Sequence, residues 1–376
     1  MKEKDIRQSN FELMRIISMF YIAFLHFFCH GKMFDKTSGY TNIIVICIAA
    51  LLVVHVNSFV LLSGYFNYDK EFKLSKIIRL NNSMWFYNFL WVIIAMFVFS
   101  ISFSNAYILD MISIIPRYNN FWFVVVYMLL YLVSPILNMI IRNIDKKQHK
   151  TIIIALLIVT TLCFITYDNF YGIKKGYSLF SFIMLYFIGA YLHKYPIDKN
   201  KIFKSSKSKV LLFAISLYVI SGLINIGLHY LGVRYINSSH EIVRNYSYVL
   251  KTGFFDYFNP IVIFGTIGYF LIFSQLNIKS KIINFYGKYV LGVYLLTDNT
   301  IARILIYKKL GFNLKSYTLK HVLLAFIISI GMVLVLPVIE FIRSKVYKFF
   351  YNRKLAKKNR VFIQNCINKL GLSVKW

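Results

Sequence analysis

Charged side chains are scarce in this chain of 376 residues. Only 15% of its residues are charged, against about a quarter in a typical soluble domain. Prolines number 5 and glycines 17, which excludes a fibrous or low-complexity chain. The four cysteines, Cys29, Cys47, Cys163 and Cys366, show neither a CxxC motif nor a paired spacing. The sequence therefore predicts neither a disulfide framework nor a zinc site.

Apolar residues are abundant instead. They make up 58% of the chain, and the mean hydropathy of +0.60 points away from a water-soluble globule. Lys and Arg number 44 against 14 Asp and Glu, so the formal net charge is +30. In a soluble protein such an excess would indicate a nucleic-acid partner. Here the basic residues cluster in short segments between apolar runs, which is typical of a membrane protein, and no nucleic-acid partner is predicted.

The long apolar runs predict transmembrane helices. A helical span needs roughly 20 apolar residues, and these runs lack the alternation of barrel strands. The expected fold class is therefore all-α, a polytopic membrane helix bundle of about ten transmembrane helices. The predicted spans are 11–30, 42–66, 83–103, 121–141, 151–168, 177–193, 210–230, 254–274, 285–305 and 321–342.

The charge of the connecting segments predicts the orientation. With the N-terminus in the cytoplasm, the cytoplasmic segments hold 29 Lys or Arg and the opposite segments hold 12. This bias obeys the positive-inside rule and places both termini in the cytoplasm. The expected domains are a transmembrane domain over 1–343 and a basic amphipathic tail over 344–376. The tail is expected either on the anionic inner leaflet or as a solvated charged segment.

The first predicted helix carries three ionisable residues, Glu12, Arg15 and His26. Such groups are costly inside a membrane and are candidates for a functional site. Arg15 and His26 fall within about 20° of one helix face and roughly 16 Å apart along its axis. The orientation puts Arg15 at the cytoplasmic edge and His26 in the outer half. The alternative is that Arg15 snorkels to lipid phosphates and pairs with Glu12, and that His26 is an ordinary interfacial histidine.

Small and polar residues also mark the second predicted helix. Asn57 begins a segment that ends with Ser63 and Gly64 near the cytoplasmic end of this helix. A small residue pair allows the backbone to approach a ligand closely. Ordinary packing between neighbouring helices is the alternative, and on its own the better interpretation.

The ninth predicted helix contains an Asp298–Asn299 pair directed to its outer half. An Asp within a span is expensive, so it is a candidate site residue. A neutralising pair between Asp298 and Arg303 is the structural alternative. We interpret His30, nearer the outer surface, and His55, alone on its helix, as structural residues.

Five segments form a series of motifs. These are Asn10 to Ile17 followed by His26, Asn57 to Phe66, Phe121 to Asn138, Leu185 to Tyr191, and Ile278 to Asn299. In order and spacing they resemble the integral-membrane acyltransferase 3 family, which O-acylates bacterial surface glycans. The first resembles that family's N-x-E-L-L-R start and R-x10-H motif, and the second its VN-x-F-x-x-x-SGYF segment. The resemblance covers nearly the whole predicted membrane domain.

The resemblance implies a cytoplasmic acyl-CoA donor, most often acetyl-CoA, and a bacterial cell membrane location. The acceptor would be a hydroxyl of a surface polysaccharide or of its lipid-linked precursor. His26 is the expected general base, with an acyl-histidine relay as a variant. No metal and no cofactor besides the acyl-CoA co-substrate is expected. The expected donor-binding residues are Glu12, Arg15, Ser63, Gly64, Lys73, Lys76 and Arg79, and the residues expected to orient the acceptor or the base are Asn57, Thr297, Asp298 and Asn299.

One position departs from the family pattern. Thr297 stands where the family commonly has a histidine, and a threonine cannot act as a base near neutral pH. This departure leaves open the alternative that the protein is a catalytically impaired relative of the family. A further alternative is a transporter or flippase of a lipid-linked saccharide, because polar residues within a multi-helix bundle also suit that class.

Overall fold

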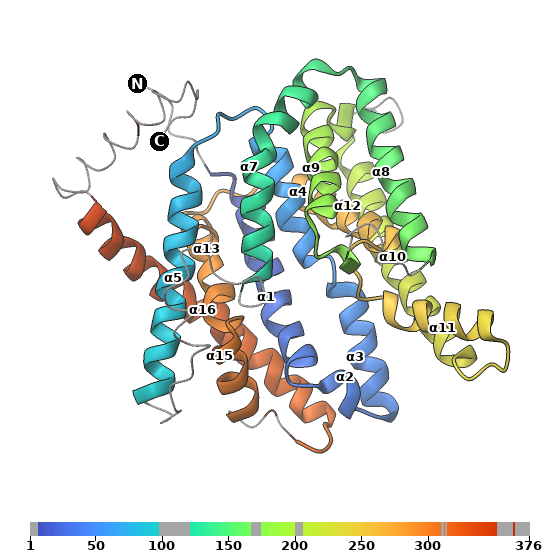
Figure 1. Cartoon of the computed structure of the whole chain (residues 1–376). Helices are drawn as coiled ribbons and strands as arrows, with labels where there is room; N and C mark the ends of the chain where they lie inside the picture. The colour runs from blue at the N-terminus through green and yellow to red at the C-terminus, as the bar shows by residue number, and fades with distance from the viewer. Residues whose placement is uncertain are drawn as a thin grey trace.

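The computed structural model describes residues 7–97, 121–166, 174–199, 206–309, 312, 314–351 and 364. Within these residues the chain is helical and forms no strand, and Figure 1 shows the helices gathered into one bundle. The longer helices are α1 (Ser9–Cys29), α3 (Gly39–Leu52), α4 (His55–Asn67), α5 (Leu74–Phe97), α7 (Trp122–Asn143), α8 (Lys146–Thr166), α9 (Leu179–Lys194), α10 (Lys207–Tyr235), α11 (Glu241–Gly253), α12 (Pro260–Ser274), α13 (Lys281–Tyr289) and α16 (Leu319–Tyr351). Shorter elements are α2 (Met33–Lys36), α14 (Leu291–Thr297), α15 (Thr300–Arg303) and the π-helical turn η3 (Ile304–Lys309).

Six helical segments are long and apolar enough to cross a bilayer. They are Ser9–Cys29, Gly39–Asn67, Trp122–Asn143, Lys146–Thr166, Lys207–Tyr235 and Leu319–Phe350. A seventh candidate is the pair Lys281–Thr297 and Thr300–Tyr307, which bends by 72° at its break. The chain is therefore a multi-pass, all-α membrane protein. Each predicted span overlaps a helix, and the number of ten transmembrane helices stays a prediction.

Segments predicted on the same side of the membrane contact one another. At one end, Asn10 Nδ2 donates to the carbonyl of Phe273, and Lys194 Nζ donates to the carbonyl of Ile144. At the other end, Lys36 Nζ donates to the carbonyl of Leu314, and Tyr317 OH donates to that of Gly31. Figure 1 shows α2 at one end of the bundle and the connection between α7 and α8 at the other. The orientation of the chain in the membrane stays a prediction.

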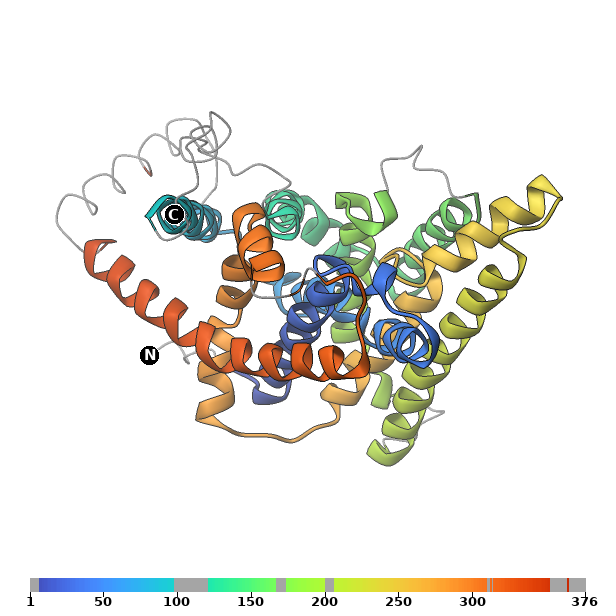
Figure 2. The same ribbon diagram turned by 90° about the horizontal axis from the view of Figure 1, so that it is seen from below.

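Helix α1 lies at the centre of the bundle. It contacts α3, α4, α12, α13, α14 and α16, and Figure 2 shows it, in dark blue, surrounded by the other helices. Apolar side chains such as Phe11, Met14, Phe24 and Phe28 are buried on several sides of it. An apolar helix surrounded by protein offers its few polar side chains only to other protein groups or to substrate.

The structure adds three features that the span prediction lacks. The second predicted span is divided at Val53–Val54 into α3 and α4, and the ninth is divided at Asp298–Asn299. The predicted connecting segment 231–253 contains α11, a short amphipathic helix. Ile242, Tyr246 and Val249 recur along one face of α11 with the spacing of helix turns.

Helices α4 and α9 pack with their backbones unusually close. A Cβ atom added at Gly64 of α4 would overlap the carbonyl of Tyr186, and one at Gly189 of α9 would overlap the carbonyl of Leu61. Two glycines thus allow this approach from both sides. The structure gives Gly64 the packing role, while its contact with a donor stays a prediction.

We predict that Gly64→Ala destabilises the protein by about 1–3 kcal/mol, because the added methyl group forces α4 and α9 apart. Thermal unfolding of the purified protein in detergent measures this. The matched control is Gly227→Ala on α10, where an added Cβ meets no atom within 4 Å. That change is expected to be neutral or to stabilise by up to about 1 kcal/mol. Equal melting temperatures for Gly64→Ala and the wild type would contradict the packing role.

Candidate active site

Helix α1 runs without a break from Ser9 to Cys29. The eleven-residue interval therefore holds Arg15 and His26 on nearly one face, roughly 16 Å apart along the axis. Arg15 Nη1 lies 2.5 Å from Glu12 Oε1, and Arg7 Nη1 lies 2.9 Å from the same oxygen. The buried Glu12 carboxylate thus pairs with two cations, so these three side chains together carry one net positive charge.

The break after α14 delivers a carboxylate to the other end of this face. Helix α14 ends at Thr297, Asp298 occupies its C-cap, and α15 begins at Thr300. Asn299 stabilises the new helix start, because its Oδ1 accepts a hydrogen bond of 2.8 Å from the Ile301 amide. Broken helices are tolerated at membrane depth where protein surrounds them. Asp298 is 1% exposed, so its charge needs partners within the protein.

Three nitrogen atoms converge on one oxygen of Asp298. Arg303 Nε donates to Oδ1 at 2.8 Å, and His30 Nε2 lies 3.2 Å from the same oxygen. His26 Nε2 approaches it at 3.6 Å, just beyond hydrogen-bonding distance. We call Asp298, His26, His30 and Arg303 the histidine–aspartate cluster. It joins the end of α1 to the break between α14 and α15.

Asp298 is buried, while its three partners are each partly exposed. The side chains of His26, His30 and Arg303 are 15%, 26% and 25% exposed. Tyr307 is fully buried beside them, with its ring centre 5.4 Å from that of His30. Its hydroxyl, His26 Nδ1 and Asp298 Oδ2 are buried without a hydrogen-bond partner. Buried polar atoms of this kind are typical of a site completed by substrate or water.

The ligand atoms of His26, His30 and Asp298 lie within 4.8 Å of one another, a spacing that a metal ion could bridge. Arg303 already supplies Asp298 with a positive charge at hydrogen-bonding distance. A cation in the same place would face this guanidinium, so the arrangement suits proton and acyl chemistry better than metal binding.

Thr297 and Asn299 flank Asp298 in the chain, and Asn57 comes from α4. Thr297 is buried, and its hydroxyl donates to the Val293 carbonyl within the same helix. Asn299 Nδ2 donates to Asn88 Oδ1. Asn57 Nδ2 donates to the Tyr257 carbonyl at 2.8 Å, and its Oδ1 is buried without a partner. These contacts hold the backbone around the site, and Asn57 Oδ1 keeps an open acceptor position.

The predicted donor-binding residues lie toward the opposite end of the bundle from His26. Ser63 Oγ accepts a hydrogen bond from Asn67 and lies 3.3 Å from the Tyr127 hydroxyl. Lys76 Nζ lies 5.1 Å from the centre of the Tyr131 ring, and the phenol of that ring accepts a hydrogen bond from the Lys73 amide. Arg79 is exposed. That these residues bind an acyl donor stays a prediction.

His30 and Tyr307 were not predicted to belong to a functional site. His30 follows His26 by four residues, the interval at which helical side chains share a face, so the sequence did contain a signal for it. Tyr307 follows Arg303 by four residues, but it lies in a π-helical turn. Turns of this kind are frequent at functional sites and have no reliable sequence signature.

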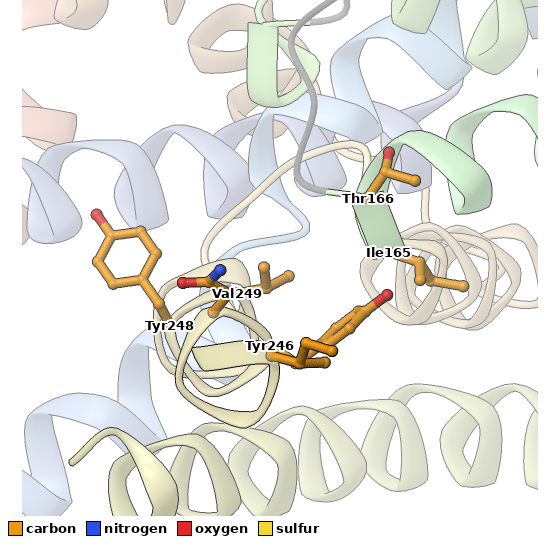
Figure 3. Close-up of a pocket in the computed structure, with 7 residues that line it drawn as sticks. Ile165, Thr166, Tyr246, Tyr248 and Val249 are labelled. Carbon is orange, nitrogen blue, oxygen red and sulfur yellow. The ribbon is translucent and has the colours of Figure 1, made fainter. Parts of the chain in front are cut away.

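One cavity of the structure lies away from this cluster. It has a volume of about 490 Å³ and lies between the end of α8 and α11 (Figure 3). Its lining includes Ile165, Thr166, Tyr246 and Val249, and the lining residues that the structure describes are apolar or uncharged polar ones. This described lining differs in kind from the histidine–aspartate cluster, whose side chains are imidazoles, a carboxylate and a guanidinium.

A many-helix membrane protein with a buried carboxylate between two imidazoles is equipped for acid–base or nucleophilic catalysis within the bilayer. The comparison with known families agrees. The chain belongs to the acyltransferase 3 family, whose model, described as an acyltransferase domain, matches residues 8–340. It is therefore an acyltransferase. No curated protein and no solved structure matches it.

We predict that Asp298→Asn destabilises the protein by about 3–5 kcal/mol, because it leaves the Arg303 guanidinium without its counter-charge. Thermal unfolding in detergent measures the loss. The double variant Asp298→Asn with Arg303→Gln removes both charges, so it should recover much of the lost stability. A double variant no more stable than Asp298→Asn alone would show that the ion pair is not the origin of the effect.

Proposed function

We propose that the protein transfers an acyl group, most simply acetyl, from cytoplasmic acyl-CoA to a hydroxyl of a surface polysaccharide or its lipid-linked precursor. The observation that carries this proposal is the convergence of His26, His30 and Arg303 on the buried Asp298 carboxylate. The family supports the reaction class. We place the enzyme in the bacterial cell membrane with both termini in the cytoplasm, since the charge bias favours this orientation.

The donor would bind at the cytoplasmic end of α1. Its phosphates need cations, and Arg15 lies on the same helix face as the catalytic cluster. Glu12 fixes the Arg15 guanidinium by an ion pair, while Arg7 on the same carboxylate keeps the local charge positive. The interval of roughly 16 Å between Arg15 and His26 lets an extended pantetheine arm carry its thioester from one to the other.

The acceptor hydroxyl would meet the thioester at His26. In the simplest course, His26 acts as a general base and takes the hydroxyl proton as the oxygen attacks the acyl carbon. The Asp298 carboxylate then stabilises the imidazolium that forms 3.6 Å away. Asn57 Oδ1, buried and without a partner, provides one further acceptor position for a hydrogen bond. The reaction as proposed uses no metal and no cofactor besides acyl-CoA.

We predict that His26→Ala abolishes O-acylation while the protein still accumulates in the membrane. The imidazole is needed whether it acts as a base or as an acyl carrier, so the expected loss is at least about 100-fold. NMR of the isolated surface polysaccharide measures the acyl content. The control is His321→Ala, a histidine hydrogen-bonded to Thr318 at the start of α16. If O-acylation persisted in His26→Ala, it would contradict the assignment of His26 as a catalytic residue.

Arg15→Ala is expected to raise the KM for acetyl-CoA about tenfold or more with little change in kcat, because a phosphate contact contributes equally to the ground state and the transition state. Initial rates of thiol release at varied acetyl-CoA measure both constants. Arg142→Ala, which removes an exposed cation paired with Asp69, is the control for general loss of positive charge. An unchanged KM would leave Arg15 as a membrane anchor only.

The same thiol-release assay separates an acyltransferase from a transporter. A flippase moves its substrate without consuming acyl-CoA, whereas the proposed enzyme releases one thiol for each acyl group transferred. Thr297 bears on a different alternative, a catalytically impaired relative of the family. Its hydroxyl donates a hydrogen bond within its own helix. His30 supplies Asp298 with an imidazole from α1 instead, which favours an active enzyme over an impaired relative.

A further inference from the structure

Two imidazoles meet one carboxylate at different depths of the same helix. His30 follows His26 by one helical turn, roughly 6 Å along α1 toward the end that we place outside. Their ring centres are 4.8 Å apart. A single general base would need only one of them, so the second imidazole requires an explanation of its own.

The contacts of the two imidazoles differ in a way that suits different tasks. His30 Nε2 is within hydrogen-bonding distance of Asp298 Oδ1, at 3.2 Å. An imidazole that donates from one nitrogen to a carboxylate is held with its other nitrogen basic, as in an aspartate–histidine dyad. His26 Nε2, at 3.6 Å, makes no hydrogen bond to this oxygen, and its Nδ1 is enclosed without a partner. With the proton on Nδ1, its Nε2 lone pair is available for attack on a carbonyl.

We propose that the two histidines divide the reaction: His26 receives the acyl group from the donor, and His30, held by Asp298, deprotonates the acceptor. The proposal rests on the acyltransferase function above and refines the role of His26 from general base to acyl carrier. It makes His30 a catalytic residue on the acceptor side of the site.

The two steps balance in atoms and charge. In the first, His26 Nε2 forms a bond to the acyl carbon, the carbon–sulfur bond breaks, and CoA leaves as a thiolate that takes a proton from the cytoplasmic side. The acyl-imidazolium keeps its proton on Nδ1. In the second, the acceptor hydroxyl gives its proton to His30 Nδ1, its oxygen bonds to the acyl carbon, and the bond to His26 Nε2 breaks. His30 then releases its proton to water.

The charges around the cluster suit this sequence. A positive charge forms first on His26 and then on His30, and the same Asp298 oxygen lies within 3.6 Å of both Nε2 atoms. Arg303 holds that oxygen in place throughout. Tyr307 encloses the pair, and Cys29 is the other ionisable side chain on this part of α1. One fixed carboxylate can thus stabilise both cations without moving.

The test separates the two half-reactions in the full-length protein in detergent or proteoliposomes. His30→Gln retains a donor for Asp298 but cannot accept the hydroxyl proton. With acetyl-CoA in the absence of acceptor it should release a burst of about one thiol per enzyme, as covalent catalysis requires. With acceptor, its kcat should fall about 100-fold or more. His26→Gln should give no burst. The control His229→Gln alters a histidine of α10 that contacts the Lys251 carbonyl on α11, and it should match the wild type.

Two more measurements exclude a merely structural role for His30. Added imidazole should restore turnover to His30→Ala in proportion to its concentration, and wild-type rates at varied substrates should give the parallel lines of a double displacement. Wild-type turnover in His30→Gln, or intersecting lines without a burst, would overturn the division of roles. If the wild type releases no thiol from acetyl-CoA under any condition, the proposed function itself fails.

Discussion

The buried charge of Asp298 is the constraint on which the rest of the site depends. A carboxylate that is 1% exposed within a membrane bundle is stable only if cations and donors surround it. Arg303 provides one such group from the same broken span, and the end of α1 provides two imidazoles. The need to neutralise one side chain therefore fixes α1, α14 and α15 relative to one another. The same contacts assemble the groups that acyl transfer needs.

Helix α1 carries polar groups at both of its ends. One of its ends carries the Glu12–Arg15 ion pair and the other carries His26 and His30. Because the helix is continuous, a substrate bound at one end has a fixed distance to the chemistry at the other. The surrounding helices cover its remaining faces with apolar side chains. A rigid, enclosed helix is a suitable element for positioning groups that act on two substrates from opposite sides.

Much of this arrangement could be predicted from the sequence, because apolar runs and loop charges follow from the physics of a bilayer. Predicting that Arg15 and His26 share one helix face required only the helical periodicity. The pairing of Asp298 with Arg303 was foreseen as the structural alternative, and the structure contains it. The sequence also contained a signal for the break at Asn299, since asparagine favours the N-cap of a helix. Its position inside an apolar run nevertheless predicted a continuous span.

Other features could not be read from the chain alone. The meeting of His30 with Asp298 joins positions 268 residues apart, and no local pattern specifies such a contact. The division between α3 and α4 falls at Val53–Val54, where the sequence has neither a glycine nor a proline that would predict it. Helix α11 is short and flanked by polar residues, so its amphipathic face was too brief to separate from a connecting segment.

The 72° bend at Asp298–Asn299 has a mechanical consequence. Lipid bilayers differ in thickness, and a straight span accommodates the mismatch by tilting as a whole, which displaces every side chain along it. A span divided at a buried carboxylate can tilt in its longer part while the shorter part keeps its angle. The site would then hold its geometry as the cell alters the lengths of its fatty acids.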